Sequence, residues 1–195
     1  FMAHRIREAM KREPLSVMLA GTIQADETYI GGDPKNRHGK GPRGRGRYTD
    51  KTPVVSLLHT ETGEVRSRTV PNVTGALLHE VIEGNVDMPN STLHTDSSRA
   101  YRMVAPEFPA HEAVDHSKGE YVRGVVTTNH VEGYFSQLCR SLDGTHHHVS
   151  VEHLDRYLAE FDYRYSTRKL SDSQRMARLM GQTAGRRLAY RSPRA

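Results

Sequence analysis

The sequence contains a single cysteine, Cys139, among its 195 residues. One thiol excludes a disulfide within the chain and any zinc module built from several cysteines, and it fits a reducing compartment. Long apolar runs are also missing, because runs such as Val54–Leu58 fall far short of the roughly 20 residues that a membrane span requires. The first residues do not have the pattern of a signal peptide. We therefore expect a soluble, intracellular protein without a membrane partner.

Three common catalytic motifs are absent as well: the P-loop, the dinucleotide-binding fingerprint and the Gly-x-Ser-x-Gly elbow. Nucleotide hydrolysis and serine-hydrolase chemistry thus lose their usual support. Acidic residues are outnumbered by basic ones, and the formal net charge is +5. A basic chain favours a polyanionic partner, of which nucleic acid is the first candidate. The length is sufficient for one domain with a hydrophobic core.

Hydrophobic periodicity predicts alternating strands and helices. Strands are expected at residues 22–30, 53–59, 64–70, 92–95 and 112–116, and helices at 2–11, 74–85, 97–103 and 129–142. A short turn-forming link at 60–63 joins the second strand to the third, so the first three strands should form an antiparallel meander. This order predicts an α/β fold with a mixed sheet of about five strands flanked by helices, as in ribonuclease-H-like domains.

Three regions are distinguished along the chain. Residues 1–18 are expected to form a leading helix and linker that follow a further upstream region, residues 19–168 the main domain, and residues 169–195 a basic tail. A basic loop at 33–51 interrupts the main domain between two strands. Its central part has six Lys or Arg residues, four glycines and no acid. That composition is typical of a mobile, positively charged excursion.

Polar residues at strand ends and at a helix start form a candidate metal site. Asp26 lies in the first strand, on the face turned away from its apolar side chains, and Asp96 follows the fourth strand. Asn129 and Glu132 share one side of the helix at 129–142, because residues three apart lie on one helical face. Crowded carboxylates repel by roughly 4 kcal/mol per pair at about 4 Å, and a divalent cation offsets that repulsion. The pattern predicts two Mg²⁺ ions that support phosphoryl transfer.

Structural roles remain open for the same residues. Asn129 and Glu132 also match a capping box, in which the asparagine accepts a first-turn N–H and the glutamate reaches back. Asp96 could cap the short helix that follows it, and Asp26 could be a solvated carboxylate at a strand end. Cys139 has no identifiable neighbouring base, so a structural thiol is favoured over a nucleophile.

The histidine tract at 146–148 could bind a transition metal, since imidazole is a common ligand of zinc, copper and nickel. Adjacent side chains in an extended loop point in alternating directions, however, so contact with backbone phosphates or the rim of the site is favoured. The residues predicted to contact DNA are Lys35, Arg37, Lys40, Arg43, Arg45, Arg47, Arg99, Arg123, Arg140, His146, His147, His148, Arg164 and Arg168.

Six ordered blocks of the sequence resemble bacterial insertion-sequence transposases. The blocks are Ala25–Gly32, Thr95–Tyr101, Gly119–Gly124, Thr128–Gly133, Gly144–Ser150 and Tyr157–Phe161. Together they span most of the chain. The resemblance implies a DDE-superfamily catalytic domain of ribonuclease-H-like fold, which cuts transposon ends and joins them to target DNA with Mg²⁺ or Mn²⁺.

The resemblance also implies roles for particular residues. Asp26 and Asp96 match the first two acidic positions, and the third position, an asparagine or a glutamate in this group, falls on Asn129 with Glu132 close by. The implied partner is double-stranded DNA, as transposon ends and as target, bound by a homo-oligomer. The implied location is the bacterial cytoplasm, beside the nucleoid. Members usually carry an upstream zinc ribbon and helix-turn-helix, and this sequence begins after that region.

Three positions depart from the family pattern. A lysine expected ten residues after the third ligand is replaced by Cys139, and an acid and a histidine expected before the Thr-Asn pair are replaced by Val125 and Thr127. The departures leave two alternatives to an active transposase. One is a DNA-binding protein of transposase descent that does not cut DNA, and the other is a stand-alone metal-dependent nuclease.

Overall fold

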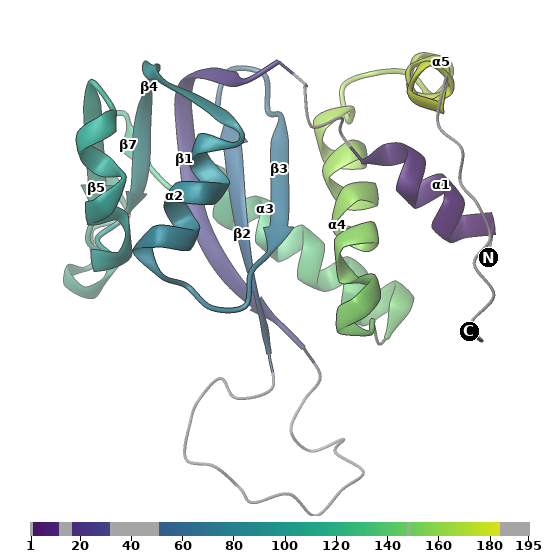
Figure 1. Ribbon diagram of the computed structural model, residues 1–195, viewed down its shortest axis with the longest axis horizontal. Coiled ribbons are helices and arrows are strands. Elements are labelled where there is room, and N and C mark those ends of the chain that lie inside the picture. Colours follow the sequence, from purple (N-terminus) through teal and green to yellow (C-terminus); the bar gives the residue numbers. More distant parts are fainter. Residues whose placement is uncertain (1, 12–16, 32–50, 148, 184–195) are drawn as a thin grey trace, which may run out of the picture.

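The computed structural model describes residues 2–11, 17–31, 51–147 and 149–183 (Figure 1). The strands are β1 (Leu19–Ile30), β2 (Thr52–His59), β3 (Val65–Thr69), β4 (Val86–Asp96), β5 (Ala110–Val114), β6 (Val122–Arg123) and β7 (Val126–Thr127). The α-helices are α1 (Met2–Met10), α2 (Gly75–Glu83), α3 (Asn129–Ser141), α4 (Val151–Ser166) and α5 (Asp172–Thr183). Short 3₁₀ segments are η2 (Arg99–Met103), η3 (Ala105–Glu107) and η4 (His116–Lys118), and η5 (Leu142–His146) is a π-helical turn.

The main sheet has five strands in the order β3-β2-β1-β4-β5. β1, β2 and β3 form an antiparallel meander, whereas β4 runs parallel to β1 and β5 runs parallel to β4. The predicted mixed sheet and its initial meander are confirmed, and the fold is ribonuclease-H-like. None of the described helices is both long enough and apolar enough to cross a lipid bilayer.

Each face of the sheet has its own hydrophobic core, because side chains alternate between the two faces along every strand. On one face, Ile23 and Ala25 of β1 pack with the buried stripe of α2. The other face packs against α3 and α4, with Leu138 and Leu158 among its buried residues. Figure 1 shows α2 in front of the sheet and α3 behind it. Polar residues of β1 at even positions therefore face α3.

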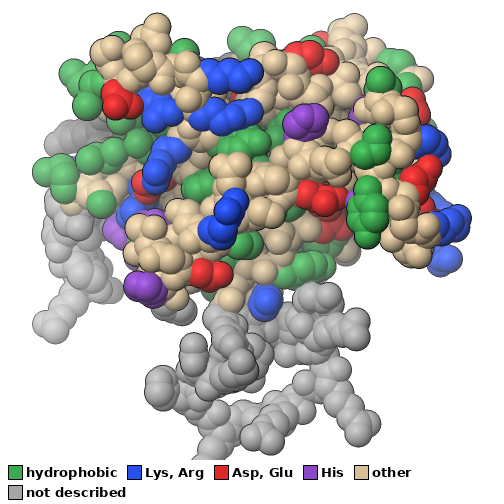
Figure 2. Space-filling model, turned by 180° about the vertical axis from the view of Figure 1, so that it is seen from behind, with side chains coloured by type: hydrophobic (Ala, Val, Ile, Leu, Met, Phe, Trp, Pro, Cys, Tyr) green, Lys and Arg blue, Asp and Glu red, His purple; other side chains and the backbone are tan. Residues whose placement is uncertain are grey.

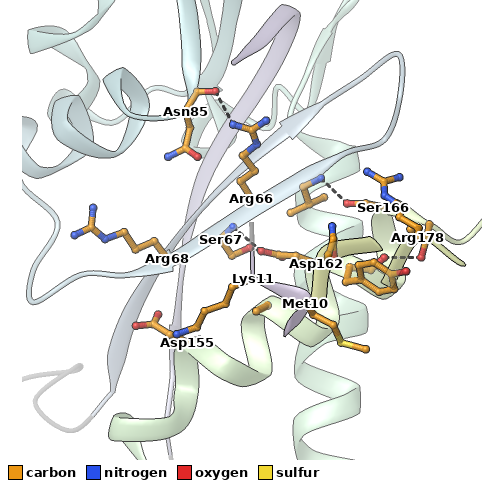
Figure 3. Close-up of a pocket in the computed structure, with 15 residues that line it drawn as sticks. Met10, Lys11, Arg66, Ser67, Arg68, Asn85, Asp155, Asp162, Ser166 and Arg178 are labelled. Atoms are coloured by element: carbon orange, nitrogen blue, oxygen red, sulfur yellow. Dashed lines mark hydrogen bonds between the residues drawn. The ribbon is translucent and has the colours of Figure 1, made fainter. Parts of the chain in front are cut away.

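The outer edge of β3 is closed by side chains of α4. The outward N–H groups donate to Ser166 Oγ (from Val65, 3.0 Å), Asp162 Oδ2 (from Ser67, 2.7 Å) and Asp155 Oδ1 (from Thr69, 3.0 Å). Figure 3 shows the contacts to Ser166 and Asp162. They lie beside a hollow of about 300 Å³. An exposed strand edge is a template for pairing with another chain, and α4 removes that possibility here.

Several elements differ from the sequence-based expectations. β4 begins at Val86 rather than at residue 92, because the strand carries Pro89 through an irregular stretch where the β1–β4 register shifts. The hairpin of β6 and β7 was not expected, since strands of two residues give no periodic signal. Residues 172–183, within the predicted basic tail, form helix α5.

Candidate active site

Asp26 and Asp96 occupy matching positions on neighbouring parallel strands. β1 and β4 pair Ile23 with Leu93 and Gln24 with His94. The same register, carried two residues further, sets Asp26 beside Asp96. Neighbouring strands lie about 4.8 Å apart, and in-register residues of parallel strands point to the same face. The two carboxylates thus lie on the face of the sheet that α3 covers, close enough for the charge of Asp96 to raise the pKa of Asp26.

The buried side chain of Gln24 holds the start of α3 against this face. Its Oε1 accepts hydrogen bonds from the backbone N–H groups of His130 (3.1 Å) and Val131 (3.2 Å), and its Nε2 lies 3.1 Å from His130 Nδ1. The first N–H groups of a helix have no partner within the helix, so the Gln24 amide acts as their cap. The contact places Glu132, in the first turn of α3, close to Asp26.

Helix α3 has Thr128 as its N-cap and Asn129 as its first helical residue. The capping box centred on Asn129 is therefore not formed. Asn129 is exposed, and its backbone N–H donates to Thr127 Oγ1 at 3.0 Å. Glu132 instead accepts a hydrogen bond at Oε1 from the hydroxyl of Thr128 (2.6 Å), and His116 Nε2 lies 3.3 Å from the same oxygen.

The charge environment of Asp26 is unfavourable for an isolated anion. Burial is the main cause that raises the pKa of Asp26 to about 7, and the nearby charges of Glu27, Asp96 and Glu132 raise it further. A hydrogen bond from the N–H of Glu27, at 2.8 Å, opposes this shift. The ionised carboxylate thus needs a positive partner that the described side chains do not supply.

A fourth carboxylate, Glu27, follows Asp26 on β1 and points to the opposite face of the sheet, and its charge still raises the pKa of Asp26. Burial raises the pKa of Glu27, and the charge of Asp96 adds to the effect. The buried hydroxyl of Tyr101 donates to Glu27 Oε2 at 2.6 Å and lowers that pKa in part. The signal that could have indicated Glu27 is its place directly after Asp26 on β1, with Tyr101 in the block that contains Asp96.

Structural hydrogen bonds occupy only one oxygen of each key acid. Asp96 Oδ1 accepts from the N–H of Ser98 at 3.0 Å and stabilises the turn before η2, but the N-cap of η2 is Ser98, so Asp96 does not cap that helix. Asp26 uses Oδ1 for the N–H of Glu27, and Glu132 uses Oε1 for Thr128. None of these bonds involves Oδ2 of either aspartate or Oε2 of Glu132.

The donor set fits a hard divalent cation, although the ligands are not drawn together. Within residues 2–11, 17–31, 51–147 and 149–183, no three His, Cys, Asp or Glu side chains are close enough to form a ready metal-binding group. All donors of the cluster are oxygens, which Mg²⁺ and Mn²⁺ prefer. The pKa of Asp26 is raised mainly by burial and further by the neighbouring carboxylates, and a bound cation would favour the ionised form against both effects.

Comparison with known families gives a direct match to this part of the chain. The profile of the ISXO2-like transposase domain matches residues 18–166, which include β1, β4 and α3. The chain belongs to this transposase family. No curated protein gives a significant match.

The transposase domain is also similar to a chain in a solved assembly. That assembly is described as a cryo-EM structure of a simian T-cell lymphotropic virus intasome in complex with PP2A regulatory subunit B56 gamma. The sequence identity is 14% and the TM-score is 0.43, over 76% of this chain and 49% of the other. The transposase domain thus spans about half the length of that chain.

The residues predicted to contact DNA lie in different parts of the transposase domain. Lys35, Arg37, Lys40, Arg43, Arg45, Arg47 and His148 lie outside the described residues. Arg99 is exposed and begins η2, three residues after Asp96. Arg123 is exposed on β6 and pairs with Glu112 at 3.7 Å. Of the two, Arg99 is therefore the nearer to Asp96 in the chain.

The other described residues predicted to contact DNA, His147 excepted, make contacts within the fold. Arg168 donates to the carbonyls of Gly63 and Tyr165, and its guanidinium stacks on the Tyr165 ring. Arg164 pairs with Glu160 on α4. Arg140 donates to the carbonyl of Ser136, and the ring of His146 packs edge-on against Tyr157. His147, exposed at the end of η5, has a positive φ of 56°.

Figure 2 shows the face opposite to that of Figure 1, with Lys and Arg side chains gathered toward the end formed by α4 and α5. Acidic side chains are scattered over this face, and further Lys and Arg side chains lie at its opposite edge. Cys139, on α3, is free and half-buried, and burial raises the pKa of its thiol. A raised thiol pKa reduces the thiolate fraction, which agrees with a structural role.

Proposed function

We propose that this chain is the catalytic part of a transposase that cleaves DNA at insertion-sequence ends and joins the freed ends to target DNA. Asp26, Asp96 and Glu132 hold divalent cations, with Asn129 at the rim of the same site. The observation that carries the proposal is the matched position of Asp26 and Asp96 on β1 and β4, with the start of α3 anchored over them by Gln24. A protein of this function works beside the bacterial nucleoid and assembles as an oligomer on paired DNA ends.

The side chains have distinct tasks in this chemistry. Mg²⁺ or Mn²⁺, when bound, neutralises charge on the reacting phosphate and activates the attacking hydroxyl. Asp26 and Asp96, each fixed through Oδ1, would hold the cation together with Glu132, which is fixed through Oε1. Water is the first nucleophile and the 3′-hydroxyl of the cut strand is the second, each in an in-line displacement at phosphorus. The protein supplies no covalent nucleophile.

A cleavage assay tests the proposal directly. Full-length protein is incubated with DNA that carries the matching element's ends, in Mg²⁺, in Mn²⁺ and in EDTA. We expect cut and joined products in either metal, and a loss of at least a hundredfold in Asp26→Asn and Asp96→Asn. Asp143→Asn is the matched control, because Asp143 is exposed and lies at the far end of α3.

Each other outcome has a definite meaning. DNA that stays intact in every lane but is bound tightly would support a DNA-binding protein of transposase descent. Cutting without joining, on DNA of any sequence, would support a stand-alone nuclease. Activity that survives both aspartate substitutions would refute the proposed site.

The basic loop at 33–51 is proposed to contact the DNA backbone, on the strength of its sequence alone. Removing one phosphate interaction should reduce the slope of log affinity against log salt by roughly 0.9. Replacing Lys40, Arg43, Arg45 and Arg47 with glutamine should therefore weaken binding and flatten the salt dependence. Arg68→Gln is the control, since Arg68 forms an ion pair with Glu80 and is not predicted to contact DNA. An unchanged slope would show that the loop does not touch DNA.

A further inference from the structure

Two successive hydrogen bonds connect Glu132 to His116, which lies outside the proposed metal site. His116 Nε2 lies 3.1 Å from Thr128 Oγ1, and that hydroxyl donates to Glu132 Oε1 at 2.6 Å. Thr128 is fully buried, and its carbonyl accepts the N–H of Glu132 at 3.0 Å. Thr128, the N-cap of α3, therefore binds Glu132 through both its backbone carbonyl and its side-chain hydroxyl.

The chemistry of the three side chains decides which atom donates and which accepts in each of these hydrogen bonds. A threonine hydroxyl has one proton, and here it is given to the Glu132 carboxylate. The Thr128 oxygen can then only accept from His116, so Nε2 of His116 carries a proton. The same N–H faces Glu132 Oε1 at 3.3 Å, which agrees with this tautomer. Two donors thus converge on one oxygen of Glu132.

His116 lies in a loop that hydrogen bonds close. Asp115 Oδ1 accepts from the N–H and the hydroxyl of Ser117, and Lys118 pairs with Asp115 Oδ2 at 3.1 Å. Glu120 closes the loop, since its N–H donates to the Asp115 carbonyl at 3.1 Å. The ring of Tyr121 packs against the His116 ring, with centroids 5.1 Å apart. The imidazole is thereby oriented before any ligand arrives.

We propose that His116 and Thr128 are positioning residues that fix Oε1 of Glu132 and so direct Oε2 toward the cation shared with Asp26 and Asp96. The proposal rests on the proposed function, and it makes Glu132 the third ligand, with Asn129 outside the coordination shell. Partners behind a ligand typically change metal affinity by 10- to 100-fold when they are removed, because the ligand then loses its fixed orientation.

Manganese binding, measured by the loss of the free Mn²⁺ signal in electron paramagnetic resonance, tests the proposal without DNA or turnover. Thr128→Val removes the hydroxyl and keeps the shape, whereas Thr128→Ser keeps the hydroxyl. His116→Phe removes the donor, whereas His116→Gln keeps an N–H near the position of Nε2. We expect about 10-fold or weaker binding for Thr128→Val and His116→Phe, and affinity within about threefold of wild type for Thr128→Ser and His116→Gln.

The controls separate the possible failures. Asn129→Ala should bind Mn²⁺ like the wild type, and Glu132→Gln should be at least as impaired as Thr128→Val. If wild-type protein does not bind Mn²⁺, the proposed function fails together with this inference. If wild type binds and both Thr128→Val and His116→Phe bind equally well, only the positioning role is refuted. Should Thr128→Val not fold by circular dichroism, His116→Phe decides, because the His116 side chain is 30% exposed and tolerates replacement.

Discussion

The hydroxyl of Tyr101 donates a hydrogen bond of 2.6 Å to Oε2 of Glu27, and so connects the turn after Asp96 to the residue after Asp26. Tyr101 is fully buried. Its own pKa is raised, mainly by burial and then by the charge of Glu27. The hydrogen bond links the segment after Asp96 to β1 beside Asp26, so its removal should affect the surroundings of both aspartates.

Tyr101→Phe should lower the free energy of unfolding by about 1–3 kcal/mol at pH 8, because a partly buried carboxylate loses a hydrogen bond. Since that bond lowers the pKa of Glu27, the pKa of Glu27 should rise further in the variant. Denaturant titration at pH 5 and pH 8 measures the effect. The loss should be smaller at pH 5, where Glu27 is more often protonated. Equal losses at both pH values would contradict this account.

Asp26 should make stability depend on pH when no divalent cation is present. The unfolded chain releases this proton near pH 4, whereas the folded state keeps it up to about pH 7. Stability should therefore fall as the pH rises from about 4 to about 7, by up to about 4 kcal/mol. Asp26→Asn should lose this component and be more stable than wild type at pH 8 in EDTA.

Thermal unfolding of both proteins at pH 5 and pH 8 provides the measurement. Addition of Mg²⁺ at pH 8 should raise the melting temperature of wild type and leave that of Asp26→Asn nearly unchanged. Asp143→Asn serves as the control and should follow wild type. If the wild-type melting temperature responds neither to pH nor to Mg²⁺, ionisation of Asp26 does not destabilise the folded state.

Gln24→Leu should loosen the first turn of α3. The substitution leaves the N–H groups of His130 and Val131 without their acceptor, at a cost of about 1–3 kcal/mol. Hydrogen exchange at those two amides should accelerate more than elsewhere in α3. Gln137→Leu is the matched control, because Gln137 is exposed on the same helix. Similar exchange in both variants would argue that Gln24 is not the anchor.

Asp162→Ala should detach α4 from the edge of the sheet. Asp162 accepts hydrogen bonds from the N–H of Ser67 (2.7 Å), the Ser67 hydroxyl (2.8 Å) and the Tyr134 hydroxyl (2.5 Å). Because several buried donors lose their partner at once, we expect a loss of about 2–4 kcal/mol in urea titration and faster exchange at Ser67. Asp172→Ala, an exposed acid at the start of α5, should change stability by less than about 0.5 kcal/mol.

Local patterns were sufficient for most of the elements. The meander, α2 with its Thr74 cap, and α3 all have strong periodic or capping signals, and the structure confirms them. The β6–β7 hairpin is too short to give a period. β4 was expected six residues too late because proline normally excludes a central strand, and only the register shift opposite β1 accommodates Pro89.

Spacing alone left the roles of Asn129 and Glu132 undecided. The structure removes the Asn129 capping box, because the helix begins one residue earlier than that motif requires and Thr128 takes the cap position. The link from Glu132 to His116 could not be foreseen, since His116 comes from the loop after β5. The contact of Gln24 with α3 could not be foreseen either, since it spans 106 residues of chain.

By itself, the sequence determined the basic charge, the alternation of strands and helices, and the transposase family, because each of these depends on composition or on neighbours along the chain. Only the tertiary structure decided that β1 and β4 pair in parallel so that Asp26 and Asp96 lie near each other, and that Glu27 binds Tyr101 on the other face of the sheet. It also decided that Thr128 and His116 both contact Oε1 of Glu132. These relationships depend on strand register and helix docking between distant segments, and the free energy that sets them comes from buried contacts that no local pattern encodes.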